Sequence, residues 1–143
     1  MEIISVTELT DEIFDALQRL TPLIVPVTAP TRDELRELIL ADATTLLVAR
    51  SDDGTQPIAG ALTLICFRVP TGCRAIIEDV VVDESARGQG VAKSLMREAL
   101  RLAKEYGAAG VMLTSNPRRV AANKLYQKMG FNRWETNVYF YEF

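Results

Sequence analysis

The sequence contains no histidine and only two cysteines among its 143 residues. Without histidine, Ser–His and Cys–His nucleophilic systems and most zinc sites are excluded, so we predict no bound metal. Cys66 and Cys73 lie in or beside strand-like runs. So few cysteines suggest reduced thiols in a cytoplasmic protein rather than a disulfide framework. Any proton transfer must therefore use a carboxylate, a tyrosine, a cysteine, a lysine or water.

Long apolar runs and an excess of basic charge are also missing. No run approaches the roughly 18 apolar residues that span a bilayer, and residues 1–12 resemble no secretory leader. The formal net charge is −3, which argues against a general nucleic-acid-binding protein. An apolar share of 48% and a charged share of 24% are typical of one soluble domain, here residues 1–143. We therefore expect neither a nucleic-acid nor a membrane partner.

The most informative stretch covers residues 75–92. An apolar run to Val82 is interrupted only by Glu78 and Asp79, and the glycine-bearing turn 87–90 then leads into a strongly helical pattern. A strand, a glycine turn and a helix start leave backbone N–H groups without partners. Such N–H groups attract anions, phosphates above all.

Hydrophobic periodicity predicts a mixed α/β (α+β) fold with one β-α-β crossover and helices on both faces of a mixed sheet. The predicted strands cover residues 2–6, 44–50, 58–69, 73–82, 111–114, 131–134 and 138–143. The predicted helices cover residues 11–20, 32–41, 91–106 and 117–129, with start signals at Thr10, Thr31 and Asn116–Pro117. The intervening 21–30 reads as an irregular loop with three prolines, and 51–54 reads as a hairpin turn.

Two segments, RGQGVA at 87–92 and AANKLYQKMGF at 121–131, resemble motifs of the GCN5-related N-acetyltransferases, the GNAT family. The first fits the family's pyrophosphate-loop pattern, and in the second a tyrosine follows an asparagine on a short helix. IEDVVVD at 77–83 is most similar to the small bacterial or amino-sugar-phosphate acetyltransferase branch. The resemblance implies a mostly antiparallel sheet of about six or seven strands, with splayed parallel strands at 80–82 and 111–114 and about four flanking helices.

The resemblance also implies an N-acetyltransferase that uses acetyl-CoA as co-substrate. Backbone N–H groups of the loop would bind the pyrophosphate, and the splayed strand edge would pair with the pantetheine arm. The N–H near Val80 would polarise the thioester carbonyl, and Tyr126 would protonate the leaving thiolate. The implied cofactor-binding residues are Val80, Val81, Val82, Arg87, Gly88, Gln89, Gly90, Val91, Ala92, Asn116, Asn123 and Tyr126.

Glu78 and Asp79 are two carboxylates in an otherwise apolar strand, where burial is costly without a partner. Strict alternation along the strand would put their side chains on opposite faces of the sheet. We prefer Glu78 as the base, direct or through water, because it shares strand parity with Val80. The branch resemblance keeps Asp79 as a competitor, and an ion pair with Arg74 or another arginine is the structural alternative.

The other assignments have structural alternatives as well. The two glycines could form a simple strand-to-helix turn. Tyr126 could be a packing residue with its hydroxyl at the surface. Arg118 and Arg119 could be a solvated face rather than a contact to the 3′-phosphate of CoA.

We predict direct transfer to the primary amine of a small molecule in a ternary complex, because no residue stands out as an acyl-carrying nucleophile. The alternatives are acetylation of a protein N-terminus or lysine, and a non-catalytic CoA-binding sensor. The acceptor site is expected to involve the loop 22–31, Phe67, Arg68 and the C-terminal strands. The apolar segment 138–143 could pair at a sheet edge and form a homodimer.

Overall fold

The structure is a computed structural model that describes residues 1–52 and 57–143. These residues form two compact units, Met1–Leu113 and Thr114–Phe143. The hairpin turn predicted at 51–54 lies partly outside the described residues. No helix of the described residues is long and apolar enough to cross a membrane. That all 143 residues act as one domain stays a prediction.

Within the described residues, the first unit contains one five-stranded sheet in the order β1-β2-β3-β4-β5. Neighbouring strands run antiparallel except β4 and β5, which are parallel. The strands are β1 Glu2–Ser5, β2 Thr44–Arg50, β3 Ile58–Val69, β4 Gly72–Val82 and β5 Val111–Met112. The mixed α/β class is confirmed, but the predicted count of six or seven strands is too high.

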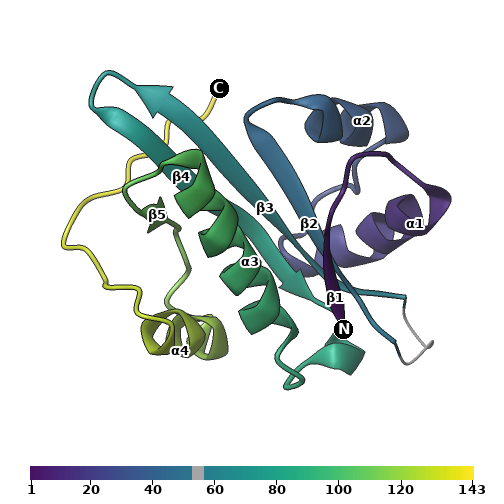
Figure 1. Ribbon diagram of the computed structural model, residues 1–143. Coiled ribbons are helices and arrows are strands. Elements are labelled where there is room, and N and C mark those ends of the chain that lie inside the picture. Colours follow the sequence, from purple (N-terminus) through teal and green to yellow (C-terminus); the bar gives the residue numbers. More distant parts are fainter. Residues whose placement is uncertain (53–56) are drawn as a thin grey trace. The chain divides into compact units, whose positions relative to one another are not determined.

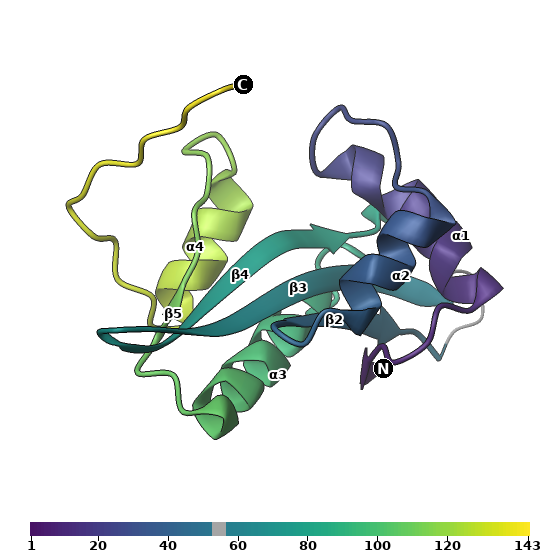
Figure 2. The same cartoon turned by 90° about the horizontal axis from the view of Figure 1, so that it is seen from above.

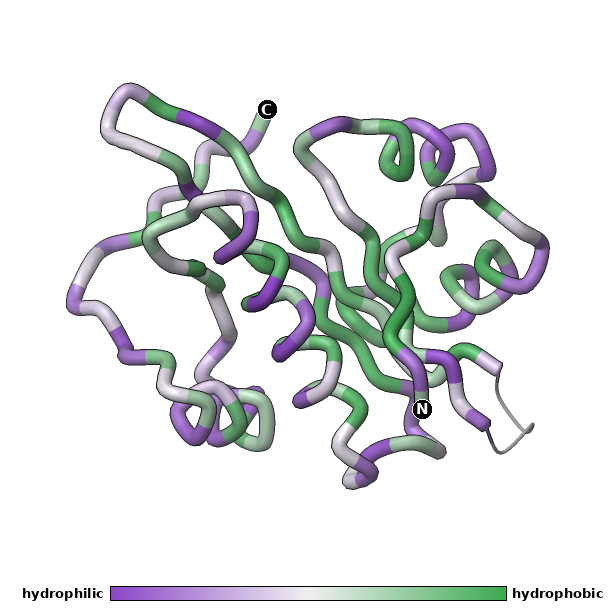
Figure 3. Tube along the Cα trace, in the orientation of Figure 1, coloured by the Kyte–Doolittle hydropathy of each residue, from purple (hydrophilic) through white to green (hydrophobic). Residues whose placement is uncertain are grey.

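Helices cover both faces of this sheet. Figures 1 and 2 show α3, Val91–Tyr106, across one face and α1, Asp11–Leu20, with α2, Arg32–Leu40, on the other. Between α1 and α2, the chain forms a short 3-10 helix, η1 Thr21–Leu23, and the proline-containing loop. Figure 3 shows that hydrophobic residues concentrate in the central strands, where both helical layers pack.

The helix α3 packs closely on the sheet because Gly60 of β3 has no side chain. A Cβ at Gly60 would lie 2.7 Å from the carbonyl oxygen of Val81 and 3.0 Å from Cγ1 of Val91. The apolar face of α3 is fully buried at its centre, as the sequence spacing predicts, whereas Tyr106 at its end is 48% exposed. The buried residues of this helix are Val91, Leu95, Met96, Ala99 and Ala103. The absence of a side chain at Gly60 therefore allows the start of α3 to pack closely against the sheet.

The second unit contains α4, Val120–Lys128, and an extended tail. The predicted helix start at Asn116–Pro117 is wrong. The Asn116 Oδ1 accepts a hydrogen bond of 2.9 Å from the Arg118 N–H. This bond closes a local Asx turn and does not cap a helix. The helix begins only after Arg119, whose ψ of 64° is not helical.

The two closing strands predicted at 131–134 and 138–143 are also wrong, because residues 131–143 form neither helix nor strand. A strand needs a neighbouring ladder, and apolar alternation alone does not supply one. The large apolar side chains of the tail are exposed: Trp134, Val138, Tyr139, Phe140, Tyr141 and Phe143. The homodimer, which was predicted from a strand at 138–143, loses that basis and stays a prediction.

Candidate active site

Strand β4 carries a bulge near its C-terminal end. The register of β3 against β4 shifts between Ala61 and Thr63, so Asp79 and Val80 both stand opposite Leu62. Among the described residues, Asp79 is the one non-glycine residue with a positive φ, 52°. A left-handed backbone costs an L-residue about 1–2 kcal/mol, although aspartate tolerates it better than most. The bulge therefore holds Asp79 in an unfavourable backbone conformation, and such conformations are concentrated at functional sites.

Beyond the bulge, β4 has no partner strand on its β5 side among the described residues. Its parallel pairing with β5 extends only over Ala75 and Ile76, opposite Val111 and Met112. Residues 80–82 therefore lie beyond the pairing with β5, as expected for two splayed strands. Their main-chain groups on that side fit a ligand that adds to the sheet as another strand would.

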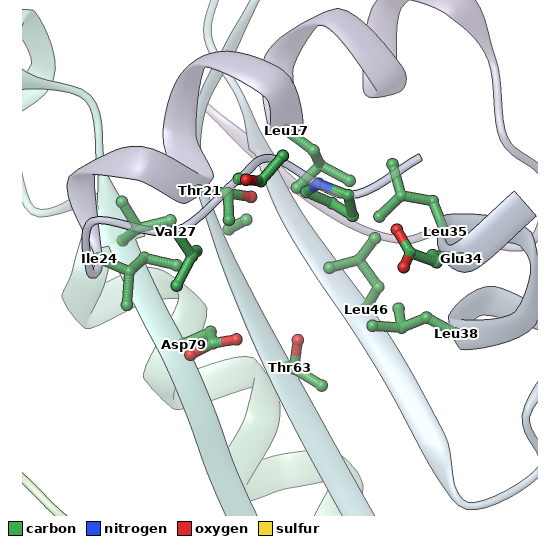
Figure 4. A pocket seen from close by; sticks show the side chains of 14 residues that line it. Leu17, Thr21, Ile24, Val27, Glu34, Leu35, Leu38, Leu46, Thr63 and Asp79 are labelled. Carbon is green, nitrogen blue, oxygen red and sulfur yellow. The ribbon is translucent and has the colours of Figure 1, made fainter. Parts of the chain in front are cut away.

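A pocket of about 360 Å³ lies on the sheet face that α1 and α2 cover, and Figure 4 shows its lining. Most of the lining is apolar and comes from α1, the following loop, α2 and the strands. These apolar residues are Leu17, Ile24, Val27, Pro30, Leu35, Leu38, Leu46, Ala61 and Val81. The polar residues are Thr21, Thr28, Glu34, Thr63 and Asp79. The loop between α1 and α2 contributes to this lining, whereas Phe67 and Arg68 do not belong to it. That the pocket is the acceptor site stays a prediction.

The bulge brings the two carboxylates of β4 to the same face. Glu78 pairs directly with Thr63, and directly opposed residues of antiparallel strands share a face. Asp79 lines the same pocket as Thr63, and Figure 4 shows both on its strand side. The prediction of opposite faces is therefore wrong, because the extra residue resets the alternation. The structural alternative, an ion pair, is absent from the described part of the chain: neither carboxylate pairs with a cation there, and Arg74 donates to the Thr71 hydroxyl at 2.8 Å.

Glu34 places a further negative charge in the pocket wall. It belongs to the capping box that begins α2, where its carboxylate accepts a hydrogen bond of 2.7 Å from the Thr31 N–H. This bond, with that from the Thr31 hydroxyl, lowers the pKa of the Glu34 carboxyl. The group is therefore ionised at neutral pH.

The N-terminus of α3 is built differently from those of α1 and α2. Thr10 caps α1 and Thr31 caps α2, and both helices carry acidic residues in their first turns. The N-cap of α3 is Gly90, and no side chain of the described residues caps this helix. Its first turn also lacks an acidic residue. The N–H groups that begin α3 therefore remain available to an anion.

The loop before α3 has the geometry of an anion cradle. Gly88 and Gly90 have φ values of 78° and 82°, a left-handed backbone that glycine adopts without strain. A Cβ at either glycine would meet no atom within 4 Å, so the backbone is open to a ligand. Lys93 is exposed and adds positive charge, as does Arg87, which also pairs with Glu84 at 3.6 Å. This open backbone, with basic side chains beside it, favours the binding of an anion such as a phosphate.

The Asp83 side chain fixes the start of this loop, a role that was not predicted from the sequence. Its carboxylate accepts hydrogen bonds from the Ser85 N–H, at 2.9 Å, and from the Ser85 hydroxyl. It also pairs with Arg19 of α1, which donates in addition to the Ile58 carbonyl at 2.9 Å. The Ser85 hydroxyl, assisted by its N–H and by Arg19, lowers the pKa of the Asp83 carboxyl against the opposing effect of burial. Arg19 lies 64 residues before Asp83, so no local sequence signal could reveal the pair.

The remaining predicted residues, Asn116, Asn123 and Tyr126, belong to the second unit. The Asn123 amide donates to the carbonyls of Asn116 and Arg119, both at 2.9 Å, so it fastens the preceding turn to α4. Tyr126 is 8% exposed, and its ring meets that of Phe131 edge to face at a centroid distance of 6.0 Å. Burial raises the pKa of the Tyr126 phenol, and the charge of Arg119 partly opposes this. The phenol is therefore protonated at neutral pH and can donate a proton.

Comparison with known proteins gives this arrangement a family. The model of the Acetyltransferase (GNAT) family matches residues 10–131. The chain belongs to the GNAT family. The predicted family resemblance is thereby confirmed.

Two curated relatives and one solved structure illustrate this GNAT chain's similarities. A mycothiol acetyltransferase of Saccharopolyspora erythraea is 41% identical over 61 residues, 43% of this chain. A glucosamine 6-phosphate N-acetyltransferase of Trypanosoma brucei brucei is 34% identical over 83 residues, 57% of this chain. The matched parts span only 20% and 54% of those two proteins. An aminoglycoside acetyltransferase from an uncultured soil metagenomic sample shares the fold, with a TM-score of 0.83, 23% identity and coverage of 99% and 95% of the two chains.

Proposed function

We propose that this GNAT protein is an acetyl-CoA-dependent N-acetyltransferase that acetylates the primary amine of a small molecule by direct attack. The observation that carries the proposal is the uncapped, glycine-framed N-terminus of α3, which directly follows a bulged strand with a free edge. An anion cradle beside an open strand edge matches a ligand that has both a pyrophosphate and an extended amide-bearing arm. The GNAT motif at 121–131 supports the same conclusion.

The C-terminal end of β4 and the loop that follows it then bind different parts of acetyl-CoA. Acetyl-CoA supplies a thioester whose acetyl carbon accepts the amine. The N–H groups of Gly88, Gly90, Val91 and Ala92 bind the pyrophosphate, and main-chain groups of 80–82 hold the pantetheine amides. The Val80 N–H stabilises the negative charge that develops on the thioester oxygen.

Asp79 is our choice for the group that removes the proton from the amine, directly or through one water. It lines the pocket and occupies the strained bulge position, whereas Glu78 is not among the lining residues. This reverses our preference from the sequence, which rested on an alternation that the bulge interrupts. As the C–N bond forms and the C–S bond breaks, Tyr126 gives its proton to the departing thiolate.

Direct transfer is favoured over an acyl-enzyme because the pocket lining offers a poor choice of nucleophiles. In the described lining the hydroxyls belong to Thr21, Thr28 and Thr63, and histidine is missing from the chain. Burial raises the pKa of the Cys66 thiol, which keeps the sulfur in its less reactive protonated form.

Replacement of Tyr126 by phenylalanine tests the proposed acid. We expect kcat to fall by about 10²-fold, as for removal of a general acid, with little change in the acetyl-CoA Kd. Tyr106→Phe is the matched control, because Tyr106 is 48% exposed on α3. The raised pKa of Tyr126 also predicts that its ionisation does not lower kcat below about pH 10.

Thiol release across a broad panel of primary amines tests the activity itself. Wild-type protein that binds acetyl-CoA but releases no thiol with any amine would leave a CoA-binding sensor as the better account. Release with peptides or protein lysines alone would shift the proposal to protein acetylation. An unchanged kcat in Tyr126→Phe would refute only the assignment of the acid.

A further inference from the structure

The pocket on the α1 and α2 side of the sheet carries information about the acceptor. It combines an apolar wall with acidic groups, and among the described residues that line it none is basic. Leu38, Leu46 and Ile24 lie on different elements around the space, as Figure 4 shows. A ligand in this pocket gains binding free energy by burying its apolar surface, at about 25 cal/mol for each Å² buried.

The charged groups of the pocket are both carboxylates and lie on different walls, Asp79 on β4 and Glu34 on α2. Glu34 is occupied as the cap of its own helix. The exposed Asp79 carboxylate accepts no hydrogen bond from the described residues, so its oxygens are available to a ligand. A cation is therefore attracted at the strand side of the pocket, next to the Thr63 hydroxyl.

Anionic acceptors meet the opposite situation. A phosphate or carboxylate in this pocket would face two negative charges without a lysine or arginine to neutralise it. Like charges brought together at a binding surface cost several kcal/mol. A sugar ring would also place some of its hydroxyls against leucine, isoleucine and valine, which is costly for each hydroxyl left without a partner.

We infer that the acceptor is a primary monoamine with an apolar body of up to about ten heavy atoms, bound with its ammonium at Asp79. The pocket of about 360 Å³ is of a size that suits such a compound. This inference rests on the proposed function and narrows its substrate class. It sets the chain apart from an enzyme for amino-sugar phosphates, the branch that its strand sequence IEDVVVD resembles.

The test is a series of straight-chain amines from ethylamine to hexylamine, with glucosamine and glucosamine 6-phosphate at equal concentrations, followed by thiol release. Each added methylene should raise kcat/KM by up to about fourfold until the pocket is full. Hexylamine should exceed glucosamine at least about tenfold, and glucosamine 6-phosphate should be the poorest substrate. A flat series, or a preference for the sugar phosphate, overturns the inference while leaving the proposed activity intact.

Competition by compounds of equal length isolates the charge. Hexanol should inhibit weakly, and hexanoate, which has the same apolar body with a negative charge, should not inhibit. Inhibition by hexanoate stronger than by hexanol contradicts the acidic assignment. If no amine is acetylated, the proposed function fails, and thermal-shift titration with hexylamine and glucosamine 6-phosphate still decides which class the pocket binds.

A variant can reverse the preference. Leu38→Arg places a cation in the pocket wall, so kcat/KM for hexylamine should fall at least about tenfold and that for glucosamine 6-phosphate should rise. Leu40→Arg is the matched control, because Leu40 lies on the same helix, is 75% exposed and is not a lining residue. Equal behaviour of the two variants would count against the pocket as the acceptor site.

Discussion

The last residues of β4 line the pocket under α2 and also lead along the chain to the N-terminus of α3. The two regions nevertheless have opposite chemistry. At α3 the groups available to a ligand are backbone N–H groups, framed by Gly88 and Gly90 and accompanied by basic side chains. In the pocket the ligand groups are side chains, apolar apart from three threonines and two carboxylates. One surface suits a polyanion, and the other suits a cation with an apolar body.

The two helices that border these surfaces differ in the same way. The first turn of α2 is closed by its own residues, Thr31 and Glu34. The first turn of α3 follows Gly90 and receives no side-chain cap from the described residues. A capped helix end stabilises the fold, and an uncapped one keeps its hydrogen-bonding groups for a ligand. The contrast indicates which helix terminus binds and which supports.

Asp79→Asn should cause the largest loss, because it removes the proposed base from the pocket while asparagine still tolerates the left-handed backbone. We expect kcat/KM to fall by about 10²–10³-fold with an unchanged acetyl-CoA Kd. Steady-state kinetics and calorimetry on the same samples check both values. Glu78→Gln is the control, and a larger loss there than at Asp79 would make Glu78 the base.

Gly90→Glu should abolish the cradle, since it adds backbone strain and a negative charge where the pyrophosphate binds. We expect the acetyl-CoA Kd to rise by about 100-fold. Gly107→Glu is closely matched: Gly107 also has a positive φ, 97°, and open space at its Cβ, but it ends α3 instead of beginning it. Comparable loss of affinity in both variants would mean that general destabilisation, not the cradle, explains the effect.

Gly60→Ala should have a smaller effect that reaches the cradle through packing. Its methyl group would lie 2.7 Å from the Val81 carbonyl oxygen of β4 and 3.0 Å from Cγ1 of Val91 on α3, so β4 and the start of α3 must both shift. We expect a loss of stability of about 1–3 kcal/mol and an increase of a few-fold in the acetyl-CoA Kd. Gly110→Ala, with no atom within 4 Å of the added Cβ, should change neither. Unaltered affinity in Gly60→Ala would show that the cradle does not depend on this contact.

The smallest effect concerns the link between α1 and the loop. The pKa of Asp83 is lowered in the folded protein, so its contribution to stability is present above its ordinary pKa of about 4 and is lost as the pH falls below that value. Asp83→Asn should therefore lower Tm by a few degrees at pH 7 and should differ little from wild type near pH 3. A loss of Tm that is the same at both pH values would contradict the ionic role of Asp83.

Much of the first unit could be predicted from the sequence, because its elements are specified locally. Thr10 and the Thr31–Glu34 box begin helices where the pattern predicts them, and β2 and β3 have the predicted bounds. The glycines of the cradle were recognisable because a left-handed turn favours that residue.

Features that depend on distant partners could not be predicted. The bulge at Asp79 is a property of the register between two strands, and a single strand sequence with strict alternation does not reveal it. The ion pair of Arg19 with Asp83 joins two segments far apart in the chain. The tail after Phe131 has the apolar composition of a strand but forms none, since no ladder pairs with it in the described residues.

The central claim is that the N-terminus of α3 binds the pyrophosphate of acetyl-CoA. Calorimetric titration of the wild-type protein and of Gly90→Glu with acetyl-CoA and, separately, with S-acetylpantetheine tests it most directly. The two compounds share the thioester and the arm but differ in the pyrophosphate and the adenosine 3′-phosphate, and the variant assigns the difference to the cradle. We predict that acetyl-CoA binds and that S-acetylpantetheine binds at least about 100-fold more weakly. Equal affinities, or no binding of acetyl-CoA, would contradict the account and leave Gly88 and Gly90 as residues of a structural turn.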